Sequence, residues 1–229
     1  MIMRLSDDGM RPNVKICCIS SIQEAALAIQ YGASALGFVS AMPSGPGPIP
    51  EELIVEIIVT VPAGIATFLL TCRQDADSII AQQQKTKANT IQLVDTVPFS
   101  VYSALRKELS GITLVQVIHV ADEASVGEAK SVAPFVDMIL LDSGNPKLAV
   151  KELGGTGRKH NWEISKQIVG FVSKPVFLAG GLNAGNVREA IDVVRPYGVD
   201  LCSGVRSNGQ LDEEKVTTFF QAINNCAPR

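Results

Sequence analysis

The stretch PVFLAGGLNAGNV, residues 175–187, joins a short apolar run to two adjacent glycines and the start of a helix. Residues 176–179 are apolar and have the length of a buried strand. Gly180 and Gly181 follow at once, and glycine lets a backbone approach a ligand closely with its N–H groups turned outward. Asn183 can cap the helix that comes next. Because a helix N-terminus carries partial positive charge, the whole unit is suited to binding an anion.

A second unit of this kind lies further along the chain. Residues 199–202 form an expected strand, and Ser203 and Gly204 turn out of it. Two neighbouring strand–glycine–turn units near the end of an α/β chain are typical of the phosphate site that follows strands seven and eight of a (β/α)8 barrel. Either unit alone is equally compatible with a tight turn that binds nothing, but the pair favours phosphate. The predicted phosphate-binding residues are Gly180, Gly181, Ser203 and Gly204.

Outward from this stretch, apolar runs alternate with helical segments along the whole chain. Strands are expected at residues 14–19, 35–39, 66–70, 90–93, 113–120, 137–141, 176–179 and 199–202, each followed by a helix. The alternating order predicts a parallel sheet, and the nearly continuous apolar strands indicate that both faces of the sheet are covered. Eight repeats without a break in composition favour a single-domain (β/α)8 TIM barrel over residues 14–229, preceded by a polar lead over residues 1–13. An open, doubly wound sheet is the alternative.

The composition excludes several classes of function. The chain has 229 residues, an apolar fraction of 46% and a net charge of −3 without a basic run, which argues against nucleic acid as a partner. No apolar stretch is long enough to span a membrane, and the polar first residues do not resemble a signal peptide, so the cytoplasm is the expected location. Five cysteines without a CxxC spacing and only two histidines predict free thiols and no metal site.

Polar groups at the carboxyl ends of the strands are the candidates for chemistry, because barrel enzymes place their active sites there. Cys17 lies near the end of the first expected strand and Asp142 at the end of the sixth. These strands are well apart around a barrel, so a thiol and a carboxyl group can face each other across its mouth as an acid–base pair. The alternatives are a buried, inert Cys17 and an Asp142 that caps a loop. Because strand side chains alternate, only one of Cys17 and Cys18 can point inward.

A further glycine cluster lies in the long loop that follows the sixth strand. It comprises Gly154, Gly155, Thr156 and Gly157. Such a cluster can wrap around a ligand or serve as the hinge of a lid, although the motif alone is not specific.

Taken together, five short motifs resemble the phosphoribosylanthranilate isomerase family. They are Lys15-Ile16-Cys17, Leu140-Leu141-Asp142-Ser143, Gly154-Gly155-Thr156-Gly157, Ala179-Gly180-Gly181-Leu182-Asn183, and Val199-Asp200 with Ser203-Gly204-Val205. The resemblance covers about residues 14–224. It implies a (β/α)8 barrel that needs no cofactor and carries out an Amadori rearrangement of a phosphorylated small molecule in tryptophan biosynthesis. It also implies that Asp142 protonates the ribose ring oxygen, that Cys17 removes the proton from the sugar C2, and that the glycine turns hold the phosphate.

The chain departs from this family at several positions. The family usually has glycine after the catalytic cysteine, and Cys18 stands there. The family's loop after the second strand usually carries an arginine, which residues 47–50 lack, and Arg73 and Arg206 are the candidates to replace it. Two alternatives therefore stay open: a related barrel enzyme that acts on a phosphorylated sugar with a different aglycone, and a protein that binds a phosphorylated ligand without catalysis.

Overall fold

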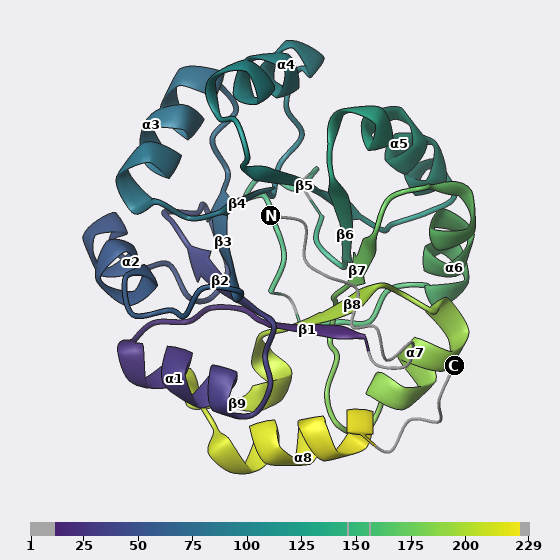
Figure 1. Ribbon diagram of the computed structural model, residues 1–229. Helices are drawn as coiled ribbons and strands as arrows, with labels where there is room; N and C mark the ends of the chain where they lie inside the picture. The colour runs from purple at the N-terminus through teal and green to yellow at the C-terminus, as the bar shows by residue number, and fades with distance from the viewer. Residues whose placement is uncertain (1–11, 146, 156, 225–229) are drawn as a thin grey trace.

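Eight parallel strands hydrogen-bond to one another in sequence order, and the first strand pairs with both the second and the eighth. The computed structural model describes residues 12–145, 147–155 and 157–224. In this part of the chain the sheet is closed, which confirms the predicted (β/α)8 barrel and excludes the open, doubly wound alternative. Figure 1 looks along the barrel and shows the helices as an outer ring around the strands.

The strands agree closely with the apolar runs of the sequence. They are β1 Asn13–Ile16, β2 Ala35–Val39, β3 Ala66–Thr71, β4 Thr90–Leu93, β5 Thr113–His119, β6 Met138–Asp142, β7 Val176–Leu178 and β8 Gly198–Leu201. The first strand ends at Ile16 and not at residue 19, because the backbone turns at Cys18, whose φ is 63°.

The helices cover the outside of the barrel in chain order. They are α1 Ile22–Gln30, α2 Glu51–Ile58, α3 Ala76–Thr86, α4 Phe99–Glu108, α5 Ala124–Val132, α6 Trp162–Phe171, α7 Val187–Val194 and α8 Glu213–Asn224. Two short 3-10 helices, η1 Ala133–Phe135 and η2 Ser203–Val205, and the hairpin of β9 Arg206–Ser207 and β10 Gln210–Leu211 complete the fold.

Side chains fill both sides of the sheet. The larger apolar cluster lies between the strands and the helices, while a smaller one fills the barrel itself around Phe68 and Phe177. The rings of these two phenylalanines pack edge to face with their centroids 6.0 Å apart. The barrel interior is therefore a packed core that closes the floor beneath the carboxyl ends of the strands.

Local capping explains how several helices begin. The Ser21 hydroxyl accepts a hydrogen bond from the Glu24 N–H at the start of α1, as its place before that helix predicts. The expected cap at Asn183 is wrong, since α7 begins at Val187 with Asn186 in the N-cap position. The Asn183 carboxamide instead accepts from the Gly185 N–H and closes a turn before the helix.

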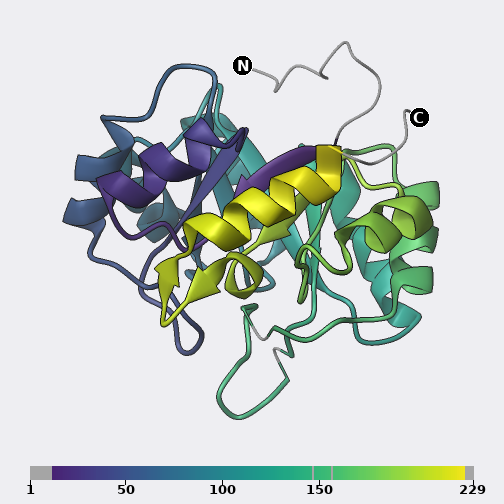
Figure 2. The same cartoon turned by 90° about the horizontal axis from the view of Figure 1, so that it is seen from below.

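Two loops project from the carboxyl end of the strands. The longer one connects β6 to α6, and Figure 2 shows it at the lower end of the barrel, away from the strand bodies. It is joined to the loop after β2 by the Ser44 hydroxyl, which donates to the Lys151 carbonyl at 2.5 Å. In the described residues no helix is both long and apolar enough to cross a membrane.

Candidate active site

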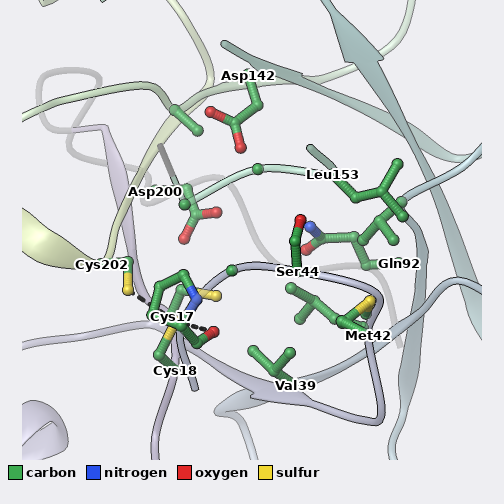
Figure 3. Close-up of a pocket in the computed structure, with 17 residues that line it drawn as sticks. Cys17, Cys18, Val39, Met42, Ser44, Gln92, Asp142, Leu153, Asp200 and Cys202 are labelled. Atoms are coloured by element: carbon green, nitrogen blue, oxygen red, sulfur yellow. Dashed lines mark hydrogen bonds between the residues drawn. The ribbon is translucent and has the colours of Figure 1, made fainter. Parts of the chain in front are cut away.

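A cavity opens at the carboxyl end of the barrel, under these two loops (Figure 3). Its polar lining consists of Cys17, Cys18, Ser44, Gln92, Asp142, Asp200 and Cys202. Its apolar wall consists of Val39, Met42, Leu70, Val94 and Leu153. The cavity therefore joins a polar side, suited to a sugar, to an apolar side, suited to a ring.

Cys17 and Asp142 both line this cavity, although they lie far apart in the sequence. Asp142 is the last residue of β6, and Cys17 directly follows β1. In Figure 3 Asp142 lies across the cavity from Cys17, with Asp200 between them. The barrel thus brings the two residues predicted as an acid–base pair to the same opening.

The loop after β6 closes over Asp142. One carboxylate oxygen of Asp142 accepts the Ser143 N–H at 2.7 Å, so the side chain does cap the first turn of the loop. A Cβ added at Gly154 would lie 2.4 Å from the other oxygen, so the loop backbone can approach the carboxylate this closely only because residue 154 is glycine. The carboxylate is therefore held between the strand end and the glycine cluster.

Lys15 and Asp200 form a buried ion pair beside Cys17. The Lys15 ammonium donates to Asp200 Oδ2 at 2.8 Å, and Lys15 has no exposed surface. Burial alone would lower the pKa of Lys15, but the Asp200 carboxylate and the neighbouring thiols raise it above its usual value. The ammonium end of this ion pair therefore lies next to the Cys17 sulfur at the base of the cavity.

The pKa of Cys17 is lowered to about 6. The largest cause is a hydrogen bond from the Cys18 side chain, and the Lys15 ammonium acts in the same direction against the effect of burial. A thiol with this pKa is largely thiolate at neutral pH, so Cys17 can accept a proton there. The inert, buried thiol is thus the less suitable interpretation of Cys17.

The two glycine turns lie in contact beside the cavity. Gly180 and Gly181 have φ values of 86° and 63°, which favour glycine. A Cβ added at Gly204 would lie 2.0 Å from the Leu182 carbonyl, so the turn after β8 packs directly on the turn after β7. Ala179 and Cys202, which precede these turns, line the cavity. The four predicted phosphate-binding residues therefore lie in two turns that contact each other next to the cavity, although none of the four lines it.

The glycine cluster of the long loop reaches both parts of the site. Gly154 and Gly155 line the cavity, while Gly157 lies beside the glycine turns. A Cβ at Gly181 would lie 2.7 Å from the Gly157 carbonyl oxygen. Thr156, predicted with these three glycines, lies outside the described residues.

Comparison with known proteins agrees with this geometry. The family model described as N-(5'phosphoribosyl)anthranilate (PRA) isomerase matches residues 14–222. N-(5'-phosphoribosyl)anthranilate isomerase 2 of Methanosarcina mazei is 36% identical, with 93% of this chain and 94% of that protein covered. The chain belongs to the phosphoribosylanthranilate isomerase family.

Solved structures of this family have the same fold. The isomerase of Pyrococcus furiosus superimposes with a TM-score of 0.77 at 29% identity, covering 93% of this chain and 99% of that one. A phosphoribosyl anthranilate isomerase in complex with reduced 1-(o-carboxyphenylamino)-1-deoxyribulose 5-phosphate gives a TM-score of 0.76 at 27% identity, covering 93% and 98%.

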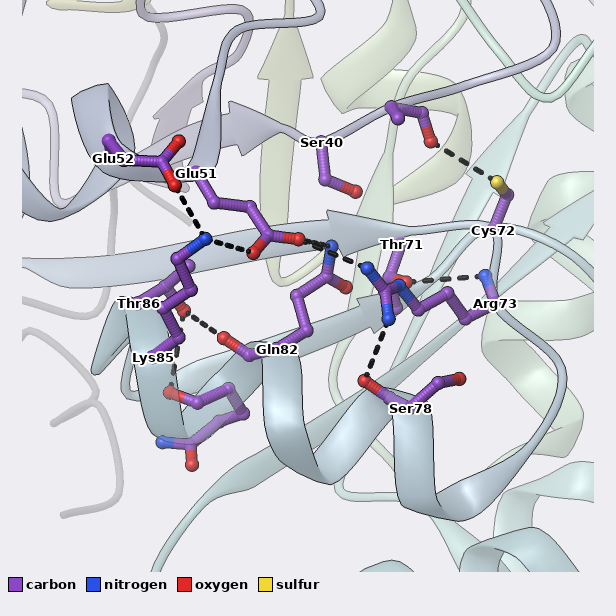
Figure 4. Close-up of polar contacts among 12 residues, drawn as sticks. Ser40, Glu51, Glu52, Thr71, Cys72, Arg73, Ser78, Gln82, Lys85 and Thr86 are labelled. Carbon is purple, nitrogen blue, oxygen red and sulfur yellow. Dashed lines mark hydrogen bonds and ion pairs between the residues drawn. The ribbon is translucent and has the colours of Figure 1, made fainter.

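Neither arginine proposed as a substitute for the family's loop arginine lines the cavity. Arg73 donates to Glu51 at 3.2 Å and to the Ser78 carbonyl at 3.3 Å, in a surface network between α2 and α3 (Figure 4). Arg206 is buried and donates to Glu24 at 2.7 Å and to the Cys18 carbonyl at 2.6 Å. Both guanidinium groups are thus committed to structural partners, and the expectation that either replaces the loop arginine is not supported.

Several cavity residues were not assigned from the sequence. Gln92, Asp200 and Cys202 all line the cavity. Gln92 Oε1 and Asp200 Oδ1 are buried without a hydrogen-bond partner in the described structure. In the sequence, a polar residue near the carboxyl end of an otherwise apolar strand is the pattern that could have identified Gln92 and Asp200. In the structure, their buried oxygens without a partner are suited to a ligand that donates hydrogen bonds.

Proposed function

We propose that this chain converts N-(5'-phosphoribosyl)anthranilate into the carboxyphenylamino-deoxyribulose phosphate of tryptophan biosynthesis, with Asp142 as general acid and Cys17 as general base. The observation that carries the proposal is that these two side chains line one cavity beside a pair of glycine turns. Membership of the isomerase family supports the same reaction. We place the enzyme in the cytoplasm, where its free thiols would stay reduced.

The reaction needs an acid first and a base second. Asp142 donates a proton to the ribose ring oxygen, which opens the sugar and leaves an imine at C1. The Cys17 thiolate then removes the proton from C2, and the resulting enolamine tautomerises to the ketone. The hydrogen is moved within the substrate, so the sequence of steps needs no external oxidant or reductant.

The groups around this pair suit the intermediates. The Lys15 ammonium and the Cys18 thiol favour the thiolate form of Cys17, which is the form that accepts the C2 proton. The free oxygens of Asp200 and Gln92 are placed to accept hydrogen bonds from the sugar hydroxyls. Acid–base catalysis of this type contributes about 100- to 10,000-fold to the rate.

The phosphate end of the substrate belongs at the glycine turns. Main-chain N–H groups of Gly180, Gly181, Ser203 and Gly204 are the donors proposed for it. Backbone donors of this kind bind phosphate at helix N-termini and in the phosphate sites of other barrels.

The part of the cavity that would hold the aglycone favours a second candidate substrate. Among the described residues that line the cavity there is no lysine or arginine, so the anthranilate carboxylate would have no basic side chain to pair with and would lie among the apolar wall, Ser44 and Gln92. This observation favours an uncharged aromatic amine in place of anthranilate, joined to the same phosphoribosyl group. The acid–base steps would be unchanged.

Turnover by the purified chain tests both candidates. Loss of the fluorescence of phosphoribosylanthranilate should follow addition of enzyme, and Cys17→Ala and Asp142→Asn should each lower kcat by about 100-fold or more. Phosphoribosylaniline, which lacks the carboxylate, serves as the matched substrate. No turnover of either compound at high enzyme concentration would exclude catalysis, whereas turnover of the aniline alone would select the second candidate.

A further inference from the structure

Two thiols are in contact at one side of the cavity. Cys202 donates to Cys18 with the two sulfur atoms 2.7 Å apart, as the dashed line in Figure 3 shows. The residues follow β8 and β1, which are neighbouring strands of the barrel. A disulfide places its sulfur atoms at about 2.05 Å, so an approach of about 0.7 Å would bring these two to bonding distance.

The surroundings hold Cys18 in this position. Its φ of 63° lies in the left-handed region, which residues other than glycine, asparagine and aspartate seldom adopt. Its sulfur lies 3.7 Å from the Pro46 carbonyl, and its Cβ is packed against Gly47, where an added Cβ would lie only 2.6 Å away. The loop after β2 therefore confines the Cys18 side chain.

The two thiols differ in their access to solvent. Cys18 is only 5% exposed, whereas Cys202 is partly exposed at the cavity wall. Of the two residues, Cys202 is thus the more accessible to an oxidant.

We propose that Cys18 and Cys202 form a reversible disulfide that switches the enzyme off, with a low-molecular-weight disulfide such as oxidised glutathione as the oxidant. Formation of the bond depends only on the contact between the two thiols. Its effect on turnover rests on the function proposed for Cys17.

The exchange balances in two steps. The Cys202 thiolate attacks one sulfur of the oxidant, the oxidant's S–S bond breaks, and one thiol leaves. The Cys18 sulfur then attacks the Cys202 sulfur of the mixed disulfide, the bond between Cys202 and the oxidant breaks, and the departing thiolate takes up the proton that Cys18 loses, which gives the second thiol. The two cysteines lose two electrons, and the oxidant is reduced to two thiols.

The new bond removes the Cys18 thiol as a possible hydrogen-bond donor beside Cys17. This donor is the largest cause of the lowered pKa of Cys17, so its loss raises that pKa. Below the new pKa, each unit of increase lowers the thiolate fraction about tenfold. The bond also ties the Cys17 turn to the turn that holds Ser203. We therefore expect oxidation to lower turnover at neutral pH by about tenfold or more.

The test uses the full-length protein, equilibrated with mixtures of oxidised and reduced glutathione. Intact mass should show the loss of two hydrogen atoms, and fragmentation of non-reduced peptides should link Cys18 to Cys202. Turnover should fall in step with the linkage and return with dithiothreitol. Cys17→Ser should still form the bond. Cys202→Ser should lose both the bond and the oxidant's effect on turnover, while Cys72→Ser, which alters a thiol outside the cavity, should keep both.

Three outcomes would overturn the proposal. They are a linkage through Cys17, no linkage even in excess oxidised glutathione, and a linkage that leaves turnover unchanged. If the reduced protein has no activity but the bond forms, the disulfide stands and the proposed isomerase function fails. If the reduced protein is active but no bond forms, the isomerase function stands and the disulfide is wrong.

Discussion

Lys15 and Asp200 are paired residues of β1 and β8, and their side chains form an ion pair of 2.8 Å inside the barrel. The pair therefore joins the first and last strands at the seam where the barrel closes. It also places an ammonium group beside the Cys17 sulfur, where that charge stabilises the thiolate. One contact thus serves both the closure of the fold and the electrostatics of the proposed base.

Replacing Lys15 should move the pH dependence of the reaction. The base works as a thiolate, so activity is present above the pKa of Cys17, about 6, and is lost as the pH falls through it. Lys15→Met removes a charge that lowers this pKa, and the acidic limb of kcat/KM should move to higher pH. Because Lys15→Met alone leaves a buried carboxylate unpaired, Lys15→Met with Asp200→Asn is the matched variant. An acidic limb that stays in place in both variants would contradict the electrostatic role of Lys15.

Replacing Cys18 tests the other group that lowers the pKa of Cys17. Cys18→Gly deletes the side-chain donor and should move the acidic limb of kcat/KM to higher pH. Cys18→Ser keeps a donor at the same position and should move it less. The comparison is made under reducing conditions by measuring kcat/KM against pH. Equal profiles for the two variants would show that the hydrogen bond from residue 18 does not set the pKa of Cys17.

Replacing Gly181 tests the proposed phosphate site. The residue has a φ of 63°, and an added Cβ would lie 2.7 Å from the Gly157 carbonyl, so Gly181→Ala must displace either the turn or the loop over it. We expect KM to rise about tenfold, the effect of losing roughly one charge-assisted hydrogen bond, with a smaller change in kcat. Inhibition by inorganic phosphate should weaken in parallel.

Gly170→Ala is the control for this substitution, because a Cβ at Gly170 meets no atom within 4 Å. It should leave KM unchanged. If Gly181→Ala raised KM while inhibition by phosphate stayed the same, the turn would not be the phosphate site.

The barrel could be predicted from the sequence because each of its strands is a local apolar run with a helix after it. The positions of Cys17 and Asp142 followed from the same pattern, since both lie at strand ends. Pairings between distant side chains left no such local signal. The partner of Arg206 is Glu24, 182 residues away, and the partner of Cys202 is Cys18, 184 residues away. Only the closure of β1 against β8 brings these residues together.

The pairing of Arg206 with Glu24 predicts an effect on stability. The Glu24 carboxylate accepts from the Arg206 guanidinium and, at 2.8 Å, from the Leu211 N–H. Burial raises the pKa of Glu24, but these hydrogen bonds lower it below its usual value overall. A carboxyl group with a lowered pKa adds stability above its unfolded pKa of about 4.3, and this stability is lost as the pH falls through the lower, folded pKa.

Glu24→Gln should therefore lower the free energy of unfolding at neutral pH by about 2–3 kcal/mol. This is somewhat less than the cost of removing one partner of a fully buried ion pair, because one edge of the Arg206–Glu24 pair reaches solvent. Denaturant unfolding at pH 7 and again near pH 3 measures this difference, which should shrink at the lower pH as the wild-type carboxylate becomes protonated. Glu108→Gln is the matched control, since the Lys107–Glu108 pair is largely exposed, and it should cost less than about 1 kcal/mol at either pH. A cost for Glu24→Gln as small as that of the control would mean that Arg206 does not depend on Glu24 to support the Cys17–Cys18 backbone.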